Sequence, residues 1–325
     1  MTAITDTSDA DERSLLERRS KALLELGTRL QHRGYAFTTV TPLTHAYNNE
    51  RYGQRWADDL RDVFGWSRSF LRRLIDPEDF DLMLQAGILR PWGEGWHCNI
   101  RWSTLGDMLF AHSAYPTTNN DAVFFGPDTY RFVSAVEQWL ASSHAAPSRA
   151  ADIGCGTGAG AISLAKALPD CQVWATDINP QALHMTSINA RLASVNNVTP
   201  VLGSLLDCVE GDLDLIIANP PYMMDAEERA YRHGGGELGS GLSVDIVESA
   251  LARLSSGGSL LLYTGVAVVK GEDPFLARLQ QRLSAAPCHW HYRELDPDVF
   301  SEELRRPEYA SVERIAAVFL TLTLE

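Results

Sequence analysis

The sequence has few cysteines, and their arrangement argues against two common kinds of site. There are five of them in 325 residues: Cys98, Cys155, Cys171, Cys208 and Cys288. They are scattered, odd in number and never spaced as Cys-x-x-Cys. This pattern predicts neither a zinc site nor a disulfide framework, so we expect no bound metal. Unpaired thiols are typical of a reducing compartment, and the cytoplasm is the expected location.

Long hydrophobic runs are also missing. No apolar stretch approaches the roughly 20 residues that a membrane-spanning helix needs. The first 20 residues are polar and acidic, which is unlike a secretory signal peptide. We therefore expect no membrane partner.

Basic side chains are in deficit. The chain has 28 Lys and Arg against 42 Asp and Glu, a formal net charge of −14. Neutralisation of phosphates dominates the affinity of proteins for nucleic acids, so this balance disfavours a general nucleic-acid binder. A local basic patch is compatible with the same counts, and an RNA or DNA partner stays open as an alternative.

The N-terminal part of the chain carries mainly helical patterns. The total length suits about two domains. Residues 1–11, rich in Thr, Asp and Ser, predict a disordered N-terminus. Leucines at three-to-four spacing predict a helix over residues 12–31. Shorter helices are predicted over 58–64, 67–75 and 79–85, and a hairpin of aromatic strands over 88–92 and 96–102. Helices followed by a hairpin predict a small winged-helix-like substrate-recognition domain over residues 12–105.

Two sets of side chains in this domain have a nucleic-acid interpretation and a structural one. In the nucleic-acid interpretation, the arginines of the predicted helix 67–75 contact DNA. In the structural interpretation, these arginines face solvent while the apolar residues of the helix pack inward. The tryptophans stack on bases or fill the hairpin core. We prefer packing for both sets, because the domain is acidic and fold alone does not give function. The residues concerned are Arg68, Arg72 and Arg73; Phe70, Leu71 and Leu74; and Trp92, Trp96 and Trp102.

Residues 106–148 predict a connector that ends in a linking helix, and from residue 149 strands and helices alternate. This alternation predicts an α/β domain over residues 149–325, with a doubly wound, mostly parallel sheet. No long helix separates the last two strands, so we expect one antiparallel strand at the C-terminus. The predicted strands are 150–154, 172–176, 198–202, 213–218, 259–264, 289–295 and 315–324, and the helices are 158–168, 180–193, 244–254 and 273–284.

One of these strands ends in an unusual way. Five of the six residues in Leu213–Ala218 are apolar, which is typical of a strand buried on both faces. The strand stops at Asn219-Pro220-Pro221-Tyr222. Neither proline can donate to a ladder, so the chain must leave the sheet there. Open α/β sheets bind their ligands at the carboxyl ends of such strands.

A glycine-rich turn follows the first strand of the same domain. Glycines occupy positions 154, 156 and 158, which allows a tight turn and a close approach to a ligand. The spacing departs from the dinucleotide fingerprint, because Ala159 stands where its third glycine would be. The next strand ends in Asp177, whose carboxylate can accept both hydroxyls of a ribose, and Asp152 is placed to hold a cationic or hydrated part of the ligand.

These motifs resemble those of the class I S-adenosylmethionine-dependent methyltransferases. The resemblance covers about residues 122–325 and implies a Rossmann-like methyltransferase sheet that binds S-adenosylmethionine. Asp152–Gly158 is similar to the first motif of these enzymes, Asp177 to the acid that grips the ribose, and Asn219–Tyr222 to the fourth motif of the amino-methyltransferases. One departure is Ser204, where the family often has an acid. The cofactor-binding residues that the resemblance implies are Phe125, Thr129, Asp152, Gly154, Cys155, Gly156, Gly158, Asp177, Ile178, Ser204, Leu205 and Asn219.

The resemblance also implies how the acceptor is held. An amide or exocyclic amine nitrogen is a poor nucleophile, because its lone pair is delocalised. The side-chain oxygen of Asn219 and the backbone carbonyl of Pro220 would accept its two N–H groups, and both bonds strengthen as charge develops on nitrogen. Tyr222 would lie flat against the planar acceptor, and Pro221 completes the substrate-binding turn. We therefore expect Asn219, Pro220 and Tyr222 to be the catalytic residues, with no metal.

A second glycine-rich segment, residues 234–241, follows this motif. Five of its eight residues are glycine, which predicts a mobile loop that closes over a substrate or, alternatively, a solvated loop without a role. His233 is open to interpretation as a catalytic base or a plain loop histidine.

The preferred hypothesis is an enzyme that methylates a planar amide or amine nitrogen, with a protein glutamine as first choice. The protein glutamine N5-methyltransferases have a similar glycine-containing stretch after their Asn-Pro-Pro-Tyr motif. The first alternative is a base in rRNA or DNA, at adenine N6 or guanine N2. A small-molecule acceptor and a non-catalytic nucleotide-sensing regulator are further alternatives.

Overall fold

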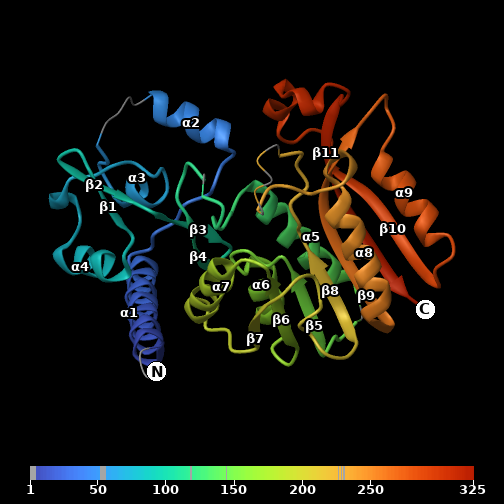
Figure 1. The fold of residues 1–325 in the computed structure, drawn as a ribbon, viewed down its shortest axis with the longest axis horizontal. Helices are drawn as coiled ribbons and strands as arrows, with labels where there is room; N and C mark the ends of the chain where they lie inside the picture. The colour runs from blue at the N-terminus through green and yellow to red at the C-terminus, as the bar shows by residue number, and fades with distance from the viewer. Residues whose placement is uncertain are drawn as a thin grey trace. The chain divides into compact units, whose positions relative to one another are not determined.

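The computed structural model describes residues 5–51, 56–117, 119–143, 145–225, 227, 229 and 231–325, with side chains from residue 13 onward. The chain divides into two compact units. The first comprises residues 1–117 and 188–194, and the second comprises residues 118–187 and 195–325. Figure 1 shows residues 1–117 of the first unit in blue to teal and the second unit in green to red; residues 188–194 of the first unit are yellow-green. Each unit is built around its own strands, so each is described by itself.

The first unit combines helices with two antiparallel hairpins. In the first hairpin β1 pairs with β2, and in the second β3 pairs with β4. Leu26, Leu30 and Trp102 are fully buried in its core. The elements are α1 (Thr5–His32), α2 (Pro42–Arg51), α3 (Leu60–Phe64), the short 3-10 helix η1 (Arg72–Leu74), α4 (Pro77–Ala86), β1 (Leu89–Trp92), β2 (Gly95–Cys98), β3 (Ile100–Leu105) and β4 (Met108–Ser113).

Three expectations for this unit differ from the structure. Helix α1 begins at Thr5, inside the segment predicted to be disordered, and residues 1–4 lie outside the described part. The predicted helix over 67–75 is absent; Phe70 there forms a β-bridge with Trp96, and only η1 is helical. Strand β4 lies in the segment expected to be a connector, so the unit extends past residue 105 to Thr117. The winged-helix interpretation stays a prediction.

Two of the three arginines of residues 67–75 are engaged inside the unit, whereas Arg73 is exposed. Arg68 donates to Asp62 at 2.7 Å and to the side chains of Asn48 and Asn49 at 3.1 Å each. The guanidinium carbon of Arg72 lies 4.0 Å from the ring centre of Phe80. Groups held in this way are less available to phosphates, which supports the packing interpretation.

The three tryptophans differ in exposure. Trp102 is fully buried and Trp96 is half-buried, as expected for hairpin core residues. Trp92, at the tip of the first hairpin, is 61% exposed. Core packing therefore accounts for Trp102 and in part for Trp96, and it is wrong for Trp92.

The second unit contains a seven-stranded sheet, as the alternating pattern predicts. Its strand order is β10-β11-β9-β8-β5-β6-β7. Strands β9, β8, β5, β6 and β7 are parallel neighbours, whereas β11 is antiparallel to both β9 and β10. The predicted C-terminal antiparallel strand is thus confirmed. The strands are β5 (Arg149–Ile153), β6 (Gln172–Asp177), β7 (Val198–Leu202), β8 (Leu213–Ala218), β9 (Leu254–Val268), β10 (Cys288–Asp296) and β11 (Arg314–Leu324).

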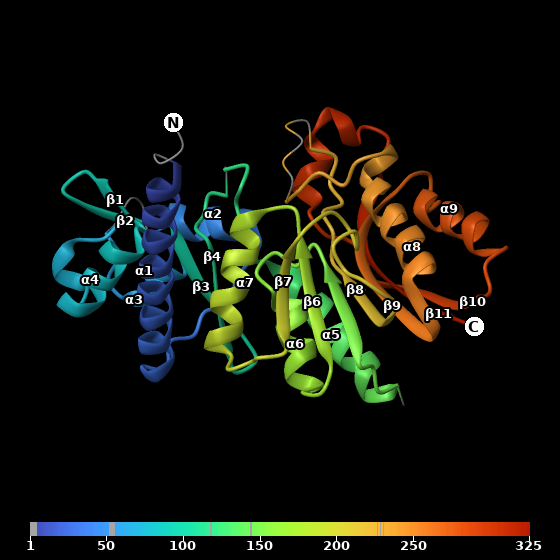
Figure 2. The same cartoon turned by 60° about the horizontal axis from the view of Figure 1, so that its bottom comes forward.

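Helices cover both faces of this sheet, which Figure 2 shows from a second direction. On one face Phe132 of α5 and Gly160 of α6 meet Ile217 of β8 and Tyr263 of β9. The other face carries α8 and α9. The helices of the unit are α5 (Pro127–Ser142), α6 (Ala159–Ala167), α7 (Pro180–Leu192, whose end groups with the first unit), α8 (Gly241–Arg253) and α9 (Pro274–Leu283), with short 3-10 helices η2 (Glu237–Gly239), η3 (Ser301–Arg305) and η4 (Pro307–Tyr309).

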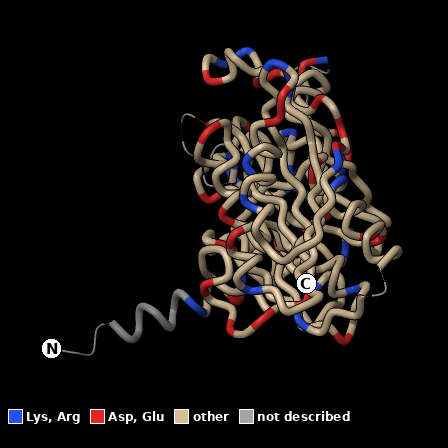
Figure 3. The backbone as a smooth tube through the Cα atoms, turned by 90° about the vertical axis from the view of Figure 1, so that its right-hand side faces the viewer, with Lys and Arg blue, Asp and Glu red and all other residues tan. Residues whose placement is uncertain are grey.

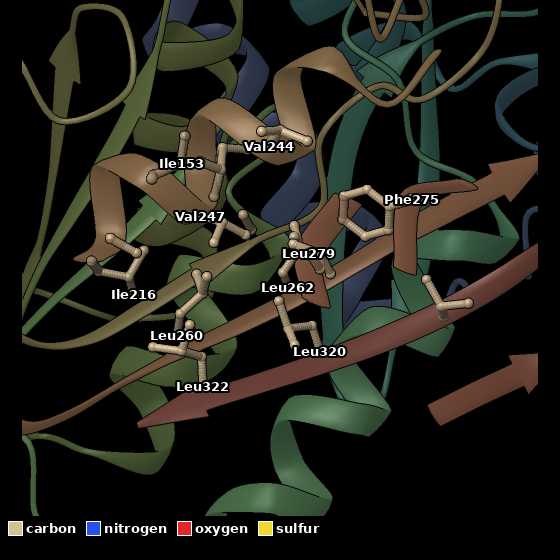
Figure 4. Packing of buried hydrophobic residues seen from close by; sticks show 14 of the residues in the cluster. Ile153, Ile216, Val244, Val247, Leu260, Leu262, Phe275, Leu279, Leu320 and Leu322 are labelled. Carbon is tan, nitrogen blue, oxygen red and sulfur yellow. The ribbon is translucent and has the colours of Figure 1, made fainter. Parts of the chain in front are cut away.

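The core beneath α8 and α9 is a continuous layer of aliphatic side chains. Val244 and Val247 of α8 and Leu279 of α9 pack against Leu260 of β9 and Leu320 of β11 (Figure 4). All five are at most 2% exposed. Ile216 of β8 belongs to the same layer, so the residues that follow Ala218 leave from a strand that is packed in the core.

Charged residues of both signs are spread along the backbone, and acidic ones are more frequent (Figure 3). Within the described ranges, no helix combines the length and apolarity that crossing a bilayer requires.

Candidate active site

The site candidates meet because three parallel strands end at the same level. Ile153 of β5 pairs with Ala218 of β8 on one side and with Thr176 of β6 on the other. The next residues along the three strands are Gly154, Asn219 and Asp177. Their convergence at one sheet edge follows from the register alone.

Asn219 leaves the edge with its side chain free. It is half-buried, and no described residue forms a hydrogen bond with its amide. Pro220 is buried and Pro221 is half-buried, so the turn is held by ring packing and by two fixed φ angles. A free amide oxygen beside a rigid turn can accept a hydrogen bond from a ligand without rearrangement.

Tyr222 is enclosed by the chain and is 7% exposed. Its ring packs on Gly265 of β9, where an added Cβ would lie 2.1 Å from a ring carbon. The ring of Phe300 meets it edge-on, with centroids 6.3 Å apart. Its hydroxyl donates to the carboxylate of Asp128. The hydroxyl and one side of the ring are therefore engaged inside the protein.

Asp128 receives several donors at the start of α5. It is 5% exposed and accepts from Tyr222 on one oxygen and from the Tyr263 hydroxyl at 2.8 Å on the other. Arg131 donates to the same carboxylate at 3.1 Å and to Asp296 at 2.9 Å. Burial raises the pKa of Asp128, and the hydrogen bonds from the two tyrosines and the charge of Arg131 oppose that rise.

The glycine turn after β5 is shaped by left-handed backbone. Gly154 has φ +69° and Gly156 has φ +53°, and an added Cβ on Gly154 would meet nothing within 4 Å. The N–H groups of Gly154 and Cys155 donate to the carbonyl of Thr176 at 2.9 and 3.0 Å. The Gly156 N–H donates to Asp177 at 2.9 Å. The turn is thus tied to the end of β6 while its outer side stays open.

The two acids of this region have different surroundings. Asp152 is 2% exposed, accepts the Ala161 N–H of α6 at 2.8 Å and lies under that helix. Burial raises the pKa of Asp152 to about 7, and the charge of Asp177 adds to the rise. Asp177 is half-buried; burial raises its pKa also, while N–H groups of Asn179, Gly156 and Ile178 oppose the rise. A cation or a hydroxyl donor beside either acid would favour its charged form.

The second glycine-rich segment packs closely on the Asn-Pro-Pro-Tyr turn. The N–H of Gly234 donates to the carbonyl of Met223 at 3.0 Å. Gly239 has φ +76°, and an added Cβ there would lie 2.2 Å from the carbonyl oxygen of Tyr222. These two glycines are buried, whereas Gly236 is exposed. In this structure the segment supports the turn from outside; its closure over a substrate stays a prediction.

The connection between β10 and β11 also reaches the turn. The Tyr309 hydroxyl accepts the Met224 N–H at 2.9 Å. Glu303 pairs with Arg232 at 2.5 Å, and Arg229 pairs with Asp225 at 2.5 Å. His233 accepts the Asp225 N–H at 3.4 Å through Nδ1, which favours the interpretation as a loop histidine.

Residues 136–268 match the family model described as the methyltransferase small domain. The chain is 40% identical over 124 residues to a release factor glutamine methyltransferase of Deinococcus radiodurans, covering 35% of this chain and 44% of that protein. It is 32% identical over 142 residues to that of Escherichia coli (40% and 51%) and 33% identical over 178 residues to that of Bordetella pertussis (50% and 61%). The chain spans about half the length of the curated relatives it matches.

The resemblance to the class I S-adenosylmethionine-dependent methyltransferases is confirmed. The matched segment contains the glycine turn, Asp177 and the Asn219–Tyr222 motif. Among solved structures, that of M. jannaschii tRNA m1G37 methyltransferase matches with a TM-score of 0.47 and 14% identity, covering 70% of this chain and 57% of that one. The structure of M. jannaschii TYW2 in complex with AdoMet matches with a TM-score of 0.46 and 16% identity (69% and 85%).

The residues at the sheet edge fit a cofactor of this methyltransferase class. Gly154 offers open space above the turn, and the half-buried Asp177 carboxylate lies beside it. Ile178, the next residue, is 60% exposed, and an aliphatic side chain at this place can pack against a flat base. Ser204 is exposed and Leu205 half-buried after β7, the neighbouring strand. This combination suits an adenosine group, and contacts of Asp177, Ile178, Ser204 and Leu205 with the cofactor stay predictions.

Other predicted cofactor residues are engaged in internal packing. Phe125 is 1% exposed and stacks edge-on with Tyr130, and the Thr129 hydroxyl accepts the Gly126 N–H at 3.3 Å. Cys155 is buried, and Gly158 packs against the side chain of Thr186. Phe124, the half-buried neighbour of Phe125 in sequence, is the residue of this segment that approaches the glycine turn. Its carbonyl oxygen lies 3.9 Å from the position that a Cβ would take on Gly156. Direct contacts of Phe125, Thr129, Cys155 and Gly158 with a cofactor stay predictions.

Sequence reasoning missed Asp128, Tyr263 and Phe300. Gly126-Pro127-Asp128 has the form of a helix start, which hides a buried carboxylate with distant partners. A tyrosine in an apolar strand, two residues before Gly265, was an available signal for Tyr263. Within the described residues, no three His, Cys, Asp or Glu side chains come together as metal ligands.

The close packing at Gly239 predicts a strong response to a single methyl group. We expect Gly239→Ala to lower the free energy of unfolding by more than the about 1–2 kcal/mol that left-handed backbone costs a non-glycine residue. The excess arises because the new Cβ meets the Tyr222 carbonyl. Gly235→Ala is the matched control, since Gly235 has φ +67° and open space around its Cα. Denaturant unfolding of both variants measures the difference, and equal losses would contradict the packing.

Proposed function

We propose that this protein is an S-adenosylmethionine-dependent N-methyltransferase whose acceptor is the side-chain amide of a glutamine in a protein. The observation that carries the proposal is the register that places Asn219 beside the glycine turn, with its amide oxygen free of internal partners. A cofactor-binding turn and an amide-binding turn then share one sheet edge.

The chain supplies orientation to the reaction. Asn219 Oδ1 and the Pro220 carbonyl accept the two N–H groups of the acceptor amide, which fixes the plane of that amide and presents one face of its nitrogen. When bound, the cofactor would supply an electrophilic methyl group from its sulfonium; the sulfur leaves as a neutral thioether as the nitrogen–carbon bond forms, and the proton lost by the nitrogen passes to water. Because both acceptor bonds strengthen as the nitrogen becomes positive, they stabilise the transition state more than the bound substrate. Holding the two reactants in fixed positions contributes the remainder of the rate enhancement.

A glutamine is preferred over a nucleic-acid base for two reasons. The curated relatives are named release factor glutamine methyltransferases, and we extend that substrate class, a translation release factor, to this chain. Arg68 and Arg72, which would contact DNA in the alternative, are engaged with neighbours in their own unit, and the net charge is −14. A release factor substrate also agrees with the predicted cytoplasmic location.

Labelling of a cell extract distinguishes the two acceptor classes. We expect the enzyme to transfer tritiated methyl groups from S-adenosylmethionine to material that resists RNase and DNase and is degraded by protease. The Asn219→Ala protein, added to the same extract, provides the background. Loss of the label on nuclease treatment would contradict the protein substrate and support a base as the acceptor.

A further inference from the structure

The carboxylate of Asp128 lies where two functional parts of the second unit meet. It lies two residues after Gly126, on which the ring of Phe124 packs, and the carbonyl of Phe124 faces the glycine turn at Gly156. Through the hydroxyl of Tyr222 it also holds the acceptor turn. Asp128 is thus hydrogen-bonded to the acceptor turn, and in sequence it lies four residues from Phe124, which faces the glycine turn.

Tyr222 transmits this attachment to the acceptor groups. Two residues separate it from Asn219, and both are prolines, so a shift of the Tyr222 ring is poorly absorbed by the intervening backbone. Gly265 and Phe300 confine the ring laterally, and the hydroxyl bond to Asp128 fixes its far end. The orientation of the Pro220 carbonyl therefore depends on where Asp128 holds Tyr222.

Asp128 is itself held in place. Tyr263 donates to its other oxygen at 2.8 Å, and Arg131 links it to Asp296 at the end of β10. Three elements, α5, β9 and β10, thus fix one carboxylate that is 5% exposed. Burying a carboxylate is costly, and apolar residues would fill a purely structural position more favourably.

We propose that Asp128 is a positioning residue for methyl transfer, which sets the acceptor turn relative to the cofactor site through Tyr222. This inference rests on the proposed function, because it concerns the same reaction. It assigns Asp128 no contact with substrate or cofactor. Tyr222 in turn serves as the link to the acceptor groups.

The test compares Asp128→Ala, Tyr222→Phe, the double variant and Tyr263→Phe in the full-length protein. Misplacement of reacting groups by about 1 Å costs on the order of 10²-fold in rate. We expect Asp128→Ala to lower kcat by about that factor, while calorimetry gives a Kd for S-adenosylmethionine within about threefold of the wild type. Because Asp128 acts through Tyr222, the double variant should be no slower than the slower single variant.

Tyr263→Phe is the matched control, since it removes a hydroxyl from the same carboxylate without altering the acceptor turn. Its loss of thermal stability should be comparable to that of Tyr222→Phe. Its fall in kcat should be clearly smaller than that of Tyr222→Phe. Asp128→Asn, which keeps the shape of the side chain and one acceptor oxygen, should recover part of the rate.

Two results would overturn the inference. One is a kcat for folded Asp128→Ala equal to that of the wild type, and the other is independent, multiplicative losses in the double variant. If the wild-type protein did not methylate purified release factor, the proposed function itself would be refuted, and this inference with it. The wild-type rate therefore separates the two failures.

Discussion

Asn219→Ala is expected to lower the rate of methyl transfer by about 10²–10³-fold, which is the usual cost of removing one preorganised hydrogen-bonding group from a transition state. The affinity for S-adenosylmethionine should stay near that of the wild type, because the glycine turn and Asp177 are held by bonds that do not involve Asn219. Single-turnover kinetics and calorimetry measure the two quantities separately.

Asn196→Ala is the matched control, since Asn196 is an exposed asparagine of the same unit, between α7 and β7. It should leave both quantities unaltered. If Asn219→Ala weakened cofactor binding and transfer by the same factor, the cofactor contact that the resemblance implies for Asn219 would account for the whole effect, and its role as an acceptor-binding group would be wrong.

Asp177→Ala has the second largest expected effect, this time on cofactor affinity. Hydrogen bonds to a charged group contribute about 1.5–3 kcal/mol each, so the loss of two ribose contacts corresponds to an increase in Kd of about 10²-fold or more. The substitution also removes the acceptor of the Gly156 N–H, which loosens the turn. Titration calorimetry with S-adenosylmethionine measures the change.

Asp245→Ala, at an exposed position of α8, controls for the loss of one negative charge. Asp177→Asn should lie between the wild type and Asp177→Ala, because the amide keeps one acceptor oxygen but cannot accept on both sides. An unaltered Kd in Asp177→Ala would show that the cofactor binds elsewhere, and the assignment of the sheet edge would fail.

The central elements of the site were predictable because they depend on one general rule. Parallel strands present their carboxyl ends at a common edge, so Gly154, Asp177 and Asn219 could be brought together from strand assignments alone. The antiparallel β11 was predictable for a similar reason, since no long helix is available to cross back over the sheet. Between β10 and β11 the structure has only the short 3-10 helices η3 and η4.

The errors occurred where short patterns have more than one solution. Phe70, Leu71 and Leu74 have helical spacing, but nine residues are too few to decide, and Phe70 instead pairs with Trp96. The hairpin of β3 and β4 was missed although Gly106-Asp107 between two apolar runs is a turn signal. Local sequence carried the information in this second case.

Other features depend on contacts between distant residues. Asp128 meets Tyr222 and Tyr263, which lie 94 and 135 positions further along the chain. The segment 234–241 has the composition of a mobile loop, yet Gly234 and Gly239 are needed for close backbone packing on Tyr222. Composition cannot distinguish a glycine that gives mobility from one that gives room.

The most direct test of the proposed function is tandem mass spectrometry of a purified release factor after incubation with this protein and S-adenosylmethionine. The proposed function predicts one added methyl group on the side-chain amide of a glutamine, with no such product from the Asn219→Ala protein. A release factor that stays unmethylated, while the same enzyme preparation methylates rRNA or DNA, would contradict it.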